Sequence, residues 1–386
     1  MTIRPSPITP PPPIPGAKGN HMKITDLTIK LFNWEGIPPR RPGDSATSQL
    51  GLVTISTDEG LQGHAFLGSS MATAEDDAPG LIRYLKPLVM GQNPLDRERL
   101  WQELWARNRQ VSFRAIGAID CALWDIGAKA AGMPLHKMLG SYRTSVPAYA
   151  SSAPMDKLEL FTDEVAHYKE RGWTAYKIHP PRIPAYDIEV CAAVREVAGP
   201  DFTLMLDSMW SYDYPWALRV GKAIEELDYY WYEDPLPEDD LGGYVKLRKN
   251  LDIPLMATEY APGGGFTAFA PWLQYGATDY LRGDIQVKGG ITPLIKAAHM
   301  AEAFHLNFEM HHGGNSLNNI AQLHVIMAMK NCEFLEVLLP DVAQKYGISE
   351  DIEVDSNGMA HASDKVGIGA EIDFVMIEKM KAAELS

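Results

Sequence analysis

The stretch "TLMLDS" at residues 203–208 is a short apolar run that ends close to an acidic residue, and the pattern returns twice downstream. It recurs as "YYWYEDP" at 229–235 and as "IPLMATEY" at 253–260. The acidic residues of the three runs are Asp207, Glu233 and Glu259. Each lies 26 residues after the one before it, about the length of one β-strand with its helix and loops. The spacing therefore predicts a carboxylate at the same height on three successive strands.

Strand-like and helical patterns alternate throughout residues 146–350, with eight strand candidates in total. Such alternation implies parallel strands joined by crossover helices. Eight units over roughly 200 residues favour a β/α barrel over an open doubly wound sheet. No glycine-rich dinucleotide fingerprint supports the open sheet. In a barrel, the C-terminal ends of the strands ring the active site, so the three carboxylates are candidate site residues.

The segments on either side of the barrel read differently. Residues 22–145 combine a hairpin-like meander with an alanine-rich helix and are predicted to form an α+β capping domain. Residues 351–386 contain strand- and turn-like patterns and are expected to return to this cap. Residues 1–21 are rich in proline and are predicted to be a disordered tail.

Composition excludes several classes of function. The chain has 386 residues, 46% of them hydrophobic, and a net charge of −15, which argues against nucleic acid or an anionic membrane as a partner. No apolar run approaches the ~20 residues that span a bilayer, and the N-terminus lacks the apolar core of a signal peptide. The three cysteines show neither metal-ligand spacing nor a disulfide framework. A reduced, cytoplasmic setting is therefore expected.

Three carboxylates at one height would repel one another unless a cation lay between them. Oxygen ligands without cysteine or histidine suit Mg²⁺ better than Zn²⁺, and Mn²⁺ is also compatible. The alternative is that these acids are solvated loop residues without a common ligand. The common spacing favours a metal site.

Six motifs, taken in order, resemble the enolase superfamily and, within it, the mandelate racemase subgroup of the mandelate racemase/muconate lactonizing enzyme family. They are "AIGAIDCALWDIGAKAAGMPLHKMLG" at 115–140, "YKIH" at 176–179, "LMLD", "YEDP", "MATE", and "GDIQVKGGIT" at 283–292. The resemblance implies a modified TIM barrel of the (β/α)7β type under an N-terminal cap. It also implies a shared first step, in which Mg²⁺ binds the substrate carboxylate and a base removes the α-proton to give an enediolate. The family's metal ligands fall on Asp207, Glu233 and Glu259.

The second strand carries a pair of proton-transfer groups, Lys177 and His179, just before a double proline. Side chains at i and i+2 of a strand share one face. By similarity to the Lys-x-Lys pair of the family, Lys177 would contact the substrate carboxylate and His179 would be an acid/base group. The alternative is that His179 only forms hydrogen bonds at the barrel rim, because the family usually has lysine there.

On the opposite face, the resemblance points to an aspartate–histidine pair. Asp284 lies five residues before Gly289 at the end of the sixth strand, where mandelate racemase relatives have an aspartate that orients a histidine from the seventh strand. The candidates are His311 and His312, of which only one can enter the barrel mouth because adjacent strand residues face opposite ways. The similarity of "HGGNS" to acid-sugar dehydratases favours His312.

Glu336, at the end of the eighth strand, falls where the family has a glutamate bonded to the substrate carboxylate. If protonated, it would share charge with the enediolate; the alternative is a salt-bridged acid at the rim. The favoured function is dehydration of an acid sugar to a 2-keto-3-deoxy acid. A racemase, epimerase or cycloisomerase acting on a 2-hydroxy or sugar acid is the main alternative, and a non-catalytic enolase-like binding protein is a further one. Homo-oligomers are common among relatives, so a homo-oligomer is expected.

Overall fold

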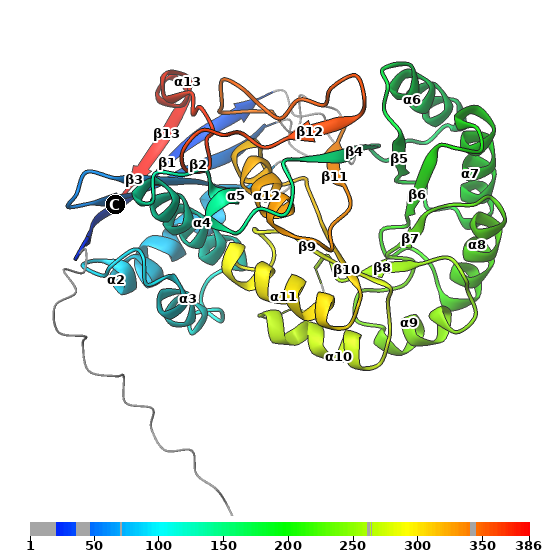
Figure 1. The fold of residues 1–386 in the computed structure, drawn as a ribbon, viewed down its shortest axis with the longest axis horizontal. Helices are drawn as coiled ribbons and strands as arrows, with labels where there is room; N and C mark the ends of the chain where they lie inside the picture. The colour runs from blue at the N-terminus through cyan, green and yellow to red at the C-terminus, as the bar shows by residue number, and fades with distance from the viewer. Residues whose placement is uncertain (1–20, 36–46, 70–71, 261–262, 264, 340–344) are drawn as a thin grey trace, which may run out of the picture.

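The structure is a computed structural model that describes residues 21–35, 47–69, 72–260, 263, 265–339 and 345–386. A ring of short strands surrounded by helices lies beside a small antiparallel sheet (Figure 1). Residues 1–20 of the predicted tail lie outside the described residues.

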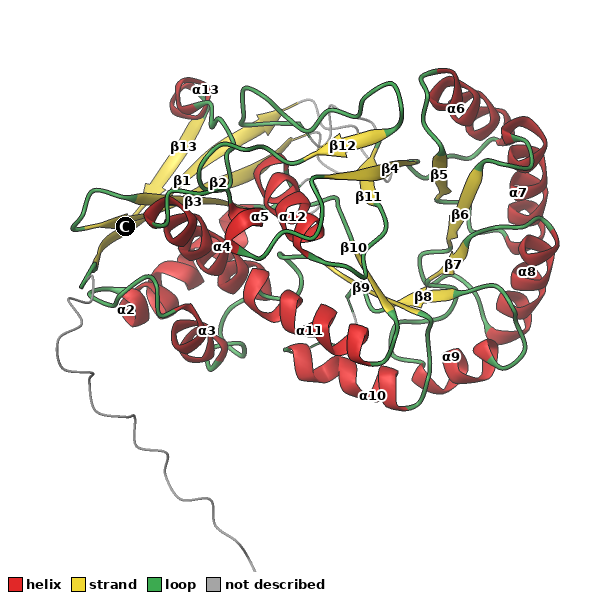
Figure 2. Cartoon of the chain, in the orientation of Figure 1, coloured by secondary structure: helices red, strands yellow, loops and turns green. Residues whose placement is uncertain are grey.

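The ring confirms the predicted (β/α)7β barrel. Eight parallel strands pair in the order β10-β9-β8-β7-β6-β5-β4-β11, and the connecting helices lie outside them (Figure 2). The strands are β4 (Ser145–Ser151), β5 (Ala175–Ile178), β6 (Thr203–Asp207), β7 (Trp231–Glu233), β8 (Leu255–Ala257), β9 (Tyr280–Gly283), β10 (Asn307–Met310) and β11 (Leu335–Leu338). The helices are α6 (Leu158–Glu170), α7 (Pro184–Ala198), α8 (Tyr214–Glu226), α9 (Leu241–Arg248), α10 (Ala270–Gln274), α11 (Ile291–Ala303) and α12 (Ser316–Ala328). The 3-10 turn η2 (Phe266–Phe269) precedes α10.

The cap confirms the predicted N-terminal α+β architecture. Its antiparallel sheet has the order β13-β1-β2-β3, so the last strand of the chain pairs with the first. The strands are β1 (Ile24–Glu35), β2 (Thr47–Thr57), β3 (Gln62–Leu67) and β13 (Lys381–Leu385). The helices are α1 (Ala74–Gly80), the π-helical η1 (Leu81–Leu85), α2 (Lys86–Val89), α3 (Arg97–Trp105), α4 (Phe113–Ala130), α5 (Leu135–Met138) and α13 (Phe374–Lys379). One further strand, β12 (Met359–His361), pairs antiparallel with β4.

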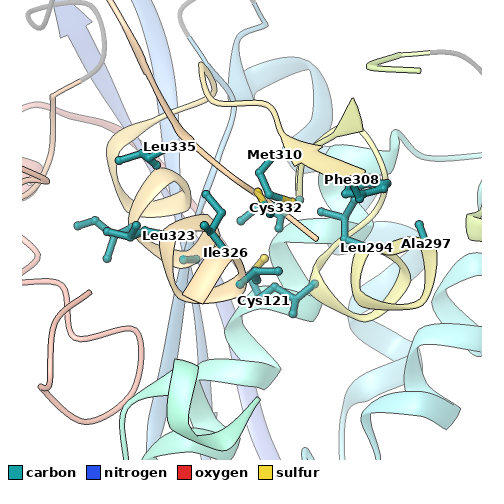
Figure 3. Close-up of a cluster of buried hydrophobic side chains, with 14 of the residues drawn as sticks. Cys121, Leu294, Ala297, Phe308, Met310, Leu323, Ile326, Cys332 and Leu335 are labelled. Atoms are coloured by element: carbon teal, nitrogen blue, oxygen red, sulfur yellow. The ribbon is translucent and has the colours of Figure 1, made fainter. Parts of the chain in front are cut away.

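Alternation along the strands separates the barrel interior from its outer layer. A small interior cluster contains Tyr149, Met205 and Trp231, whereas Phe308 and Met310 of β10 belong to the large cluster outside. Figure 3 shows these two side chains packed with Leu294 of α11 and Cys121 of the cap helix α4. The cap and the barrel therefore share one hydrophobic core.

Helix α4 is also bonded to the start of α11 by polar groups. Asp120 accepts hydrogen bonds from the backbone N–H of Thr292 (2.8 Å) and from its hydroxyl (2.6 Å). Gly290 has φ +116°, and a Cβ there would lie 2.3 Å from Asp120 Oδ2, so no other residue fits. Burial raises the pKa of Asp120 to about 7.

Among the helices of the described ranges, none is long and apolar enough to cross a membrane.

Candidate active site

The three regularly spaced carboxylates meet at the C-terminal ends of neighbouring strands. Asp207 and Glu233 are the last residues of β6 and β7 and are register partners in the ladder. Glu259 follows β8, after Thr258 turns the backbone with φ +88°. One carboxylate oxygen from each of the three lies within 4.8 Å of the others, and all three residues are buried. The structure thus brings the predicted ligand set together.

The surroundings of this triad differ from one carboxylate to the next. Burial, helped by Asp207 and Glu233, raises the pKa of Glu259 to about 7 against the opposing charges of His311 and Arg282. For Asp207 the burial effect is outweighed by Lys177 and His179, so its pKa is lowered. Asp207 and Glu259 therefore differ in how readily they hold a negative charge.

Two fully buried cations lie under the triad. Lys177 Nζ is 2.9 Å from Glu233 Oε2 and 3.3 Å from Asp207 Oδ2, and it also reaches Glu336 Oε1 at 2.9 Å. Arg282 of β9 places Nε 2.7 Å from Glu233 Oε1 and donates through Nη2 to Glu336. Arg282 is not among the site residues predicted from the sequence, although it lies two residues before Asp284 and therefore on the same inward face.

Glu336 is held as an ionised carboxylate. Its Oε1 accepts from the hydroxyl of Ser151 (2.8 Å) and from Lys177, and its Oε2 accepts from Arg282 and from the backbone N–H of His312 (3.0 Å). Although burial acts to raise it, the two cations hold the pKa of Glu336 well below its usual range. The condition for charge sharing by a protonated Glu336 is therefore not met, because every contact to its two oxygens comes from a donor.

His179 lies at the Asp207 end of the triad. Its Nδ1 donates to the backbone carbonyl of Ser152 at 2.6 Å, while its backbone N–H donates to the Ser152 hydroxyl at 2.9 Å. These contacts leave Nε2 facing the triad, 3.0 Å from Asp207 Oδ2. The ring is thus oriented by a neutral carbonyl on one side.

His311 lies at the opposite, Glu259 end. Asp284 Oδ1 accepts from the backbone N–H groups of Gln286 (2.7 Å) and Val287 (2.8 Å), and its Oδ2 pairs with His311 Nδ1 at 2.6 Å. His311 Nε2 then lies 3.2 Å from Glu259 Oε1. Burial would lower the pKa of His311, but Glu259 and Asp284 outweigh it and raise the pKa to about 9.

The choice of His312 as the partner of Asp284 was therefore wrong. Phe308 and Met310 face the outer core, so strand alternation carries His311 into the barrel and His312 away from it. His312 is buried beside a small cavity that Asn319 also lines, and its Nε2 has no hydrogen-bond partner among the described residues. Burial lowers its pKa to about 3, so this ring is neutral at physiological pH.

Comparison with known proteins follows the same division into barrel and cap. Residues 161–375 match the enolase C-terminal domain-like family, and residues 39–140 match the N-terminal domain of mandelate racemase and muconate lactonizing enzymes. The chain belongs to the mandelate racemase/muconate lactonizing enzyme family. This assignment confirms the resemblance to the enolase superfamily that the sequence motifs carry.

Relatives within this family include several acid-sugar enzymes. Arabinonate dehydratase of Saccharolobus solfataricus is 29% identical over 382 residues, which cover 93% of this chain and 99% of the relative. D-galactarolactone cycloisomerase of Agrobacterium fabrum is 28% identical over 351 residues, covering 83% and 88% of the two chains. The structure of D-glucarate dehydratase from Agrobacterium tumefaciens, complexed with magnesium, is 33% identical with a TM-score of 0.83, and the match covers 94% of this chain and 100% of that one.

The site residues fit a divalent cation. The triad brings three buried carboxylates within reach of one ligand, and the buried cations Lys177 and Arg282 are shared between the triad and Glu336. The donor set is all oxygen, as Mg²⁺ and Mn²⁺ prefer. Asp207, Glu233 and Glu259 could therefore hold such an ion.

Proposed function

We propose that the protein is a Mg²⁺-dependent dehydratase of acid sugars, which converts a sugar acid to a 2-keto-3-deoxy acid. The observation that carries the proposal is the pair of histidines at the two ends of the triad. His179 Nε2 faces Asp207 and His311 Nε2 faces Glu259. A substrate carboxylate held at the triad would therefore have one imidazole on each side of its α-carbon. The dehydratases among the relatives support the same reaction class.

Asp207, Glu233 and Glu259 would hold the metal ion. When bound there, Mg²⁺ supplies positive charge at the substrate carboxylate and so makes the α-proton more acidic. Lys177 adds a second positive charge to the same place, since its ammonium contacts two of the ligands. Mn²⁺ is expected to substitute, because it accepts the same oxygen ligands.

His311 is the proposed base. Asp284 Oδ2 accepts a hydrogen bond from Nδ1–H, so the neutral imidazole keeps its proton on Nδ1 and its lone pair on Nε2, the atom that faces the triad. The α C–H bond breaks and its proton moves to His311 Nε2. Asp284 stabilises the imidazolium that forms, and the two backbone N–H groups on its other oxygen prevent it from turning away.

His179 is the proposed acid. Its Nδ1 donates to the Ser152 carbonyl, so Nε2 is the ring atom that faces the triad and can deliver a proton to a leaving group there. The electron pair left at the α-carbon forms the new double bond, the β C–O bond breaks, and the hydroxide leaves as water with the proton of His179. The resulting enol then becomes the 2-keto acid.

Arg282 and Glu336 are proposed to keep the other groups in position. Glu336 bridges Arg282 and Lys177, and Arg282 in turn holds Glu233. This chain of ion pairs restricts Lys177, Arg282 and Glu233. The predicted role of Glu336 thus becomes support for Lys177 and Arg282.

Proton NMR in D₂O tests the reaction class. The enzyme is mixed with Mg²⁺ and a panel of aldonic, aldaric and other 2-hydroxy acids, with a chelator-treated sample as control. The expected result is loss of the α-proton signal and the appearance of a deuterated 3-deoxy-2-keto acid from at least one member. Equal turnover in the chelator-treated sample would rule out the metal-dependent step.

A second candidate function is isomerisation, either epimerisation or cycloisomerisation. Two opposed histidines also suit an epimerase, in which one removes and the other returns the α-proton, and a cycloisomerase occurs among the relatives. In the same experiment an epimerase would exchange the α-proton while only an epimer accumulated. A cycloisomerase would open a lactone or anhydro ring without releasing water. A binding protein without catalysis would give no change and no stabilisation by Mg²⁺.

The remaining expectations concern partners and setting. A small acid-sugar carboxylate is the proposed partner, and no nucleic acid or membrane is involved in the proposed reaction. A homo-oligomer in a cytoplasmic setting remains the prediction from sequence. Light scattering on the purified chain measures the oligomeric state directly.

A further inference from the structure

The cap sheet ends at β3, and the outer edge of this strand is bonded to the barrel. Phe66 offers both of its backbone polar groups to Asn318 of α12. The Phe66 N–H donates to Asn318 Oδ1 at 3.4 Å, and the Phe66 carbonyl accepts from Asn318 Nδ2 at 3.0 Å. An edge strand needs such partners, because buried N–H and C=O groups are costly when unpaired. The side-chain amide of Asn318 thus takes the place of a neighbouring strand.

Asn315 makes a second bond to the same strand end. Its Nδ2 donates to the carbonyl of Gly68 at 2.9 Å, while its Oδ1 accepts from the backbone N–H of Asn318 at 2.9 Å and so caps α12. Gly68 has φ +89°, and a Cβ there would lie 2.8 Å from the backbone nitrogen of Ala74. The end of β3 is therefore held by two amides from one turn of a barrel helix.

The same turn of α12 also reaches the end of β1. The Ser316 hydroxyl donates to the carbonyl of Tyr346, and the Tyr346 hydroxyl donates to the carbonyl of Asn33 at 2.7 Å. The Tyr346 ring stacks on Trp34, with ring centroids 5.3 Å apart. Both strand ends that face the barrel are thus connected to the first turn of α12.

This turn follows His311 by only a few residues. The connection includes Gly313 and Gly314, and a Cβ on Gly314 would lie 1.6 Å from Gln286 Nε2. Gln286 in turn belongs to the turn that binds Asp284 through its backbone N–H. The segment between His311 and Asn315 is therefore short and tightly packed, so a shift of α12 would move the histidine and the cap together.

We propose that Asn315 and Asn318 are positioning residues that hold the cap at a set distance from His311 and thereby set how tightly a substrate is held beside that histidine. They touch neither the triad nor the two histidines. The structural part of this inference stands by itself, and only its kinetic consequence rests on the proposed dehydratase function.

Hydrogen exchange tests the contact without any substrate. The variants are Asn318→Ala, which removes both bonds to Phe66, and Asn315→Asp, which keeps the helix cap but loses the donor to Gly68. Asn319→Ala is the matched control, because Asn319 is a buried asparagine of the same turn that lines the cavity beside His312 instead of bonding to β3. Loss of one hydrogen bond at the strand edge should speed exchange of the Phe66 amide about tenfold in Asn318→Ala.

Exchange of the Phe66 amide decides whether the two asparagines hold the cap. Exchange at Phe66 that is unchanged in Asn318→Ala, or raised equally by Asn319→Ala, would overturn it. If other cap amides keep their protection from exchange, the variant still folds. Asn315→Asp provides a second variant with an intact helix cap.

The kinetic readout separates positioning from mere loss of folded enzyme. In both variants KM for the acid sugar should rise about tenfold while kcat stays within about threefold, because uniform binding is lost and the proton-transfer groups remain. A fall in kcat with KM unchanged would mean a smaller fraction of folded enzyme and would contradict the inference. If the wild type acts on no acid of the panel, the proposed function fails, and the exchange result alone decides whether the two asparagines hold the cap.

Discussion

The buried histidines of α5 and α12 should make the protein lose stability as the pH falls. The Nδ1 atoms of His136 and His324 lie 3.0 Å apart, and the backbone N–H of His136 also donates to His324 Nδ1 at 3.2 Å. His324 Nε2 donates to the carbonyl of Ile368 at 2.9 Å. His324 Nδ1 must therefore carry a lone pair, and a proton there would face two donors. Burial, together with the nearby His136, lowers the pKa of His324 to about 4.

The sign and size of the effect follow from this depressed pKa. An unfolded histidine titrates near pH 6.5, so between about pH 6.5 and 4 the unfolded chain binds a proton that the folded chain does not. Above that range neither state binds it, and the contribution of His324 is constant. By linkage, the free energy of unfolding should fall by about 1.4 kcal/mol at about pH 5.5 and by about 2.5 kcal/mol at about pH 4.5.

Urea unfolding followed by tryptophan fluorescence measures this loss. His324→Gln is the matched variant, because glutamine does not titrate and can still donate to the Ile368 carbonyl. Buried acids such as Glu309, whose pKa burial raises to about 7, act in the opposite sense but are present in both proteins. The difference between wild type and variant should therefore shrink by the amounts above on acidification. Parallel pH profiles for the two proteins would show that His324 does not cause the loss of stability.

Three further perturbations have defined outcomes. Asp284→Asn should lower the rate of α-proton exchange about 10²–10⁴-fold, because an amide does not stabilise the protonated ring of His311 or impose its tautomer; an unchanged rate in the NMR assay would contradict this. Asp207→Asn should remove the rise in thermal midpoint that Mg²⁺ gives the wild type, while the midpoint without metal stays similar. An equal Mg²⁺-induced rise in variant and wild type would mean that the ligand assignment is wrong. Gly290→Ala should lower the free energy of unfolding by about 3 kcal/mol, since φ is +116° and the new Cβ would meet Asp120. A urea midpoint equal to that of the wild type would contradict this expectation.

The barrel could be predicted because its repeat leaves a regular trace in the sequence. Asp207 and Glu233 end successive strands and are register partners in the ladder, so their spacing of 26 residues measures one β/α unit. Glu259 keeps the spacing although the strand ends two residues earlier, because Thr258 turns the backbone. The edge strand β13 is different, since most of its residues are exposed and no alternation marks them.

The histidine could also have been chosen from the sequence by stricter use of alternation. Phe308 and Met310 are the apolar residues of β10 and face the outer core, which places His311 on the inner face with Glu309. The similarity of the following "HGGNS" to dehydratases outweighed that pattern and favoured His312. The local motif thus indicated the wrong histidine, whereas the alternation of side chains along β10 indicates His311.

The buried cations were harder to predict. Arginine is rarely buried, and hydropathy would place Arg282 on the surface. Its position makes sense only once Glu233 and Glu336 are known to face it across the barrel interior, which depends on strands far apart in the sequence. The four donors that contact Glu336 were also hard to predict, because they come from three strands and from the segment after β10.

Exchange of the substrate α-proton in D₂O, compared between His311→Asn and His312→Asn, tests whether His311 is the base. Both variants remove an imidazole from neighbouring positions, but only His311 pairs with Asp284 and faces the triad. The exchange rate should fall by about 10²-fold or more in His311→Asn, whereas folded His312→Asn should keep it within about tenfold of the wild type. Exchange that survives in His311→Asn and disappears in His312→Asn would contradict the assignment of the base.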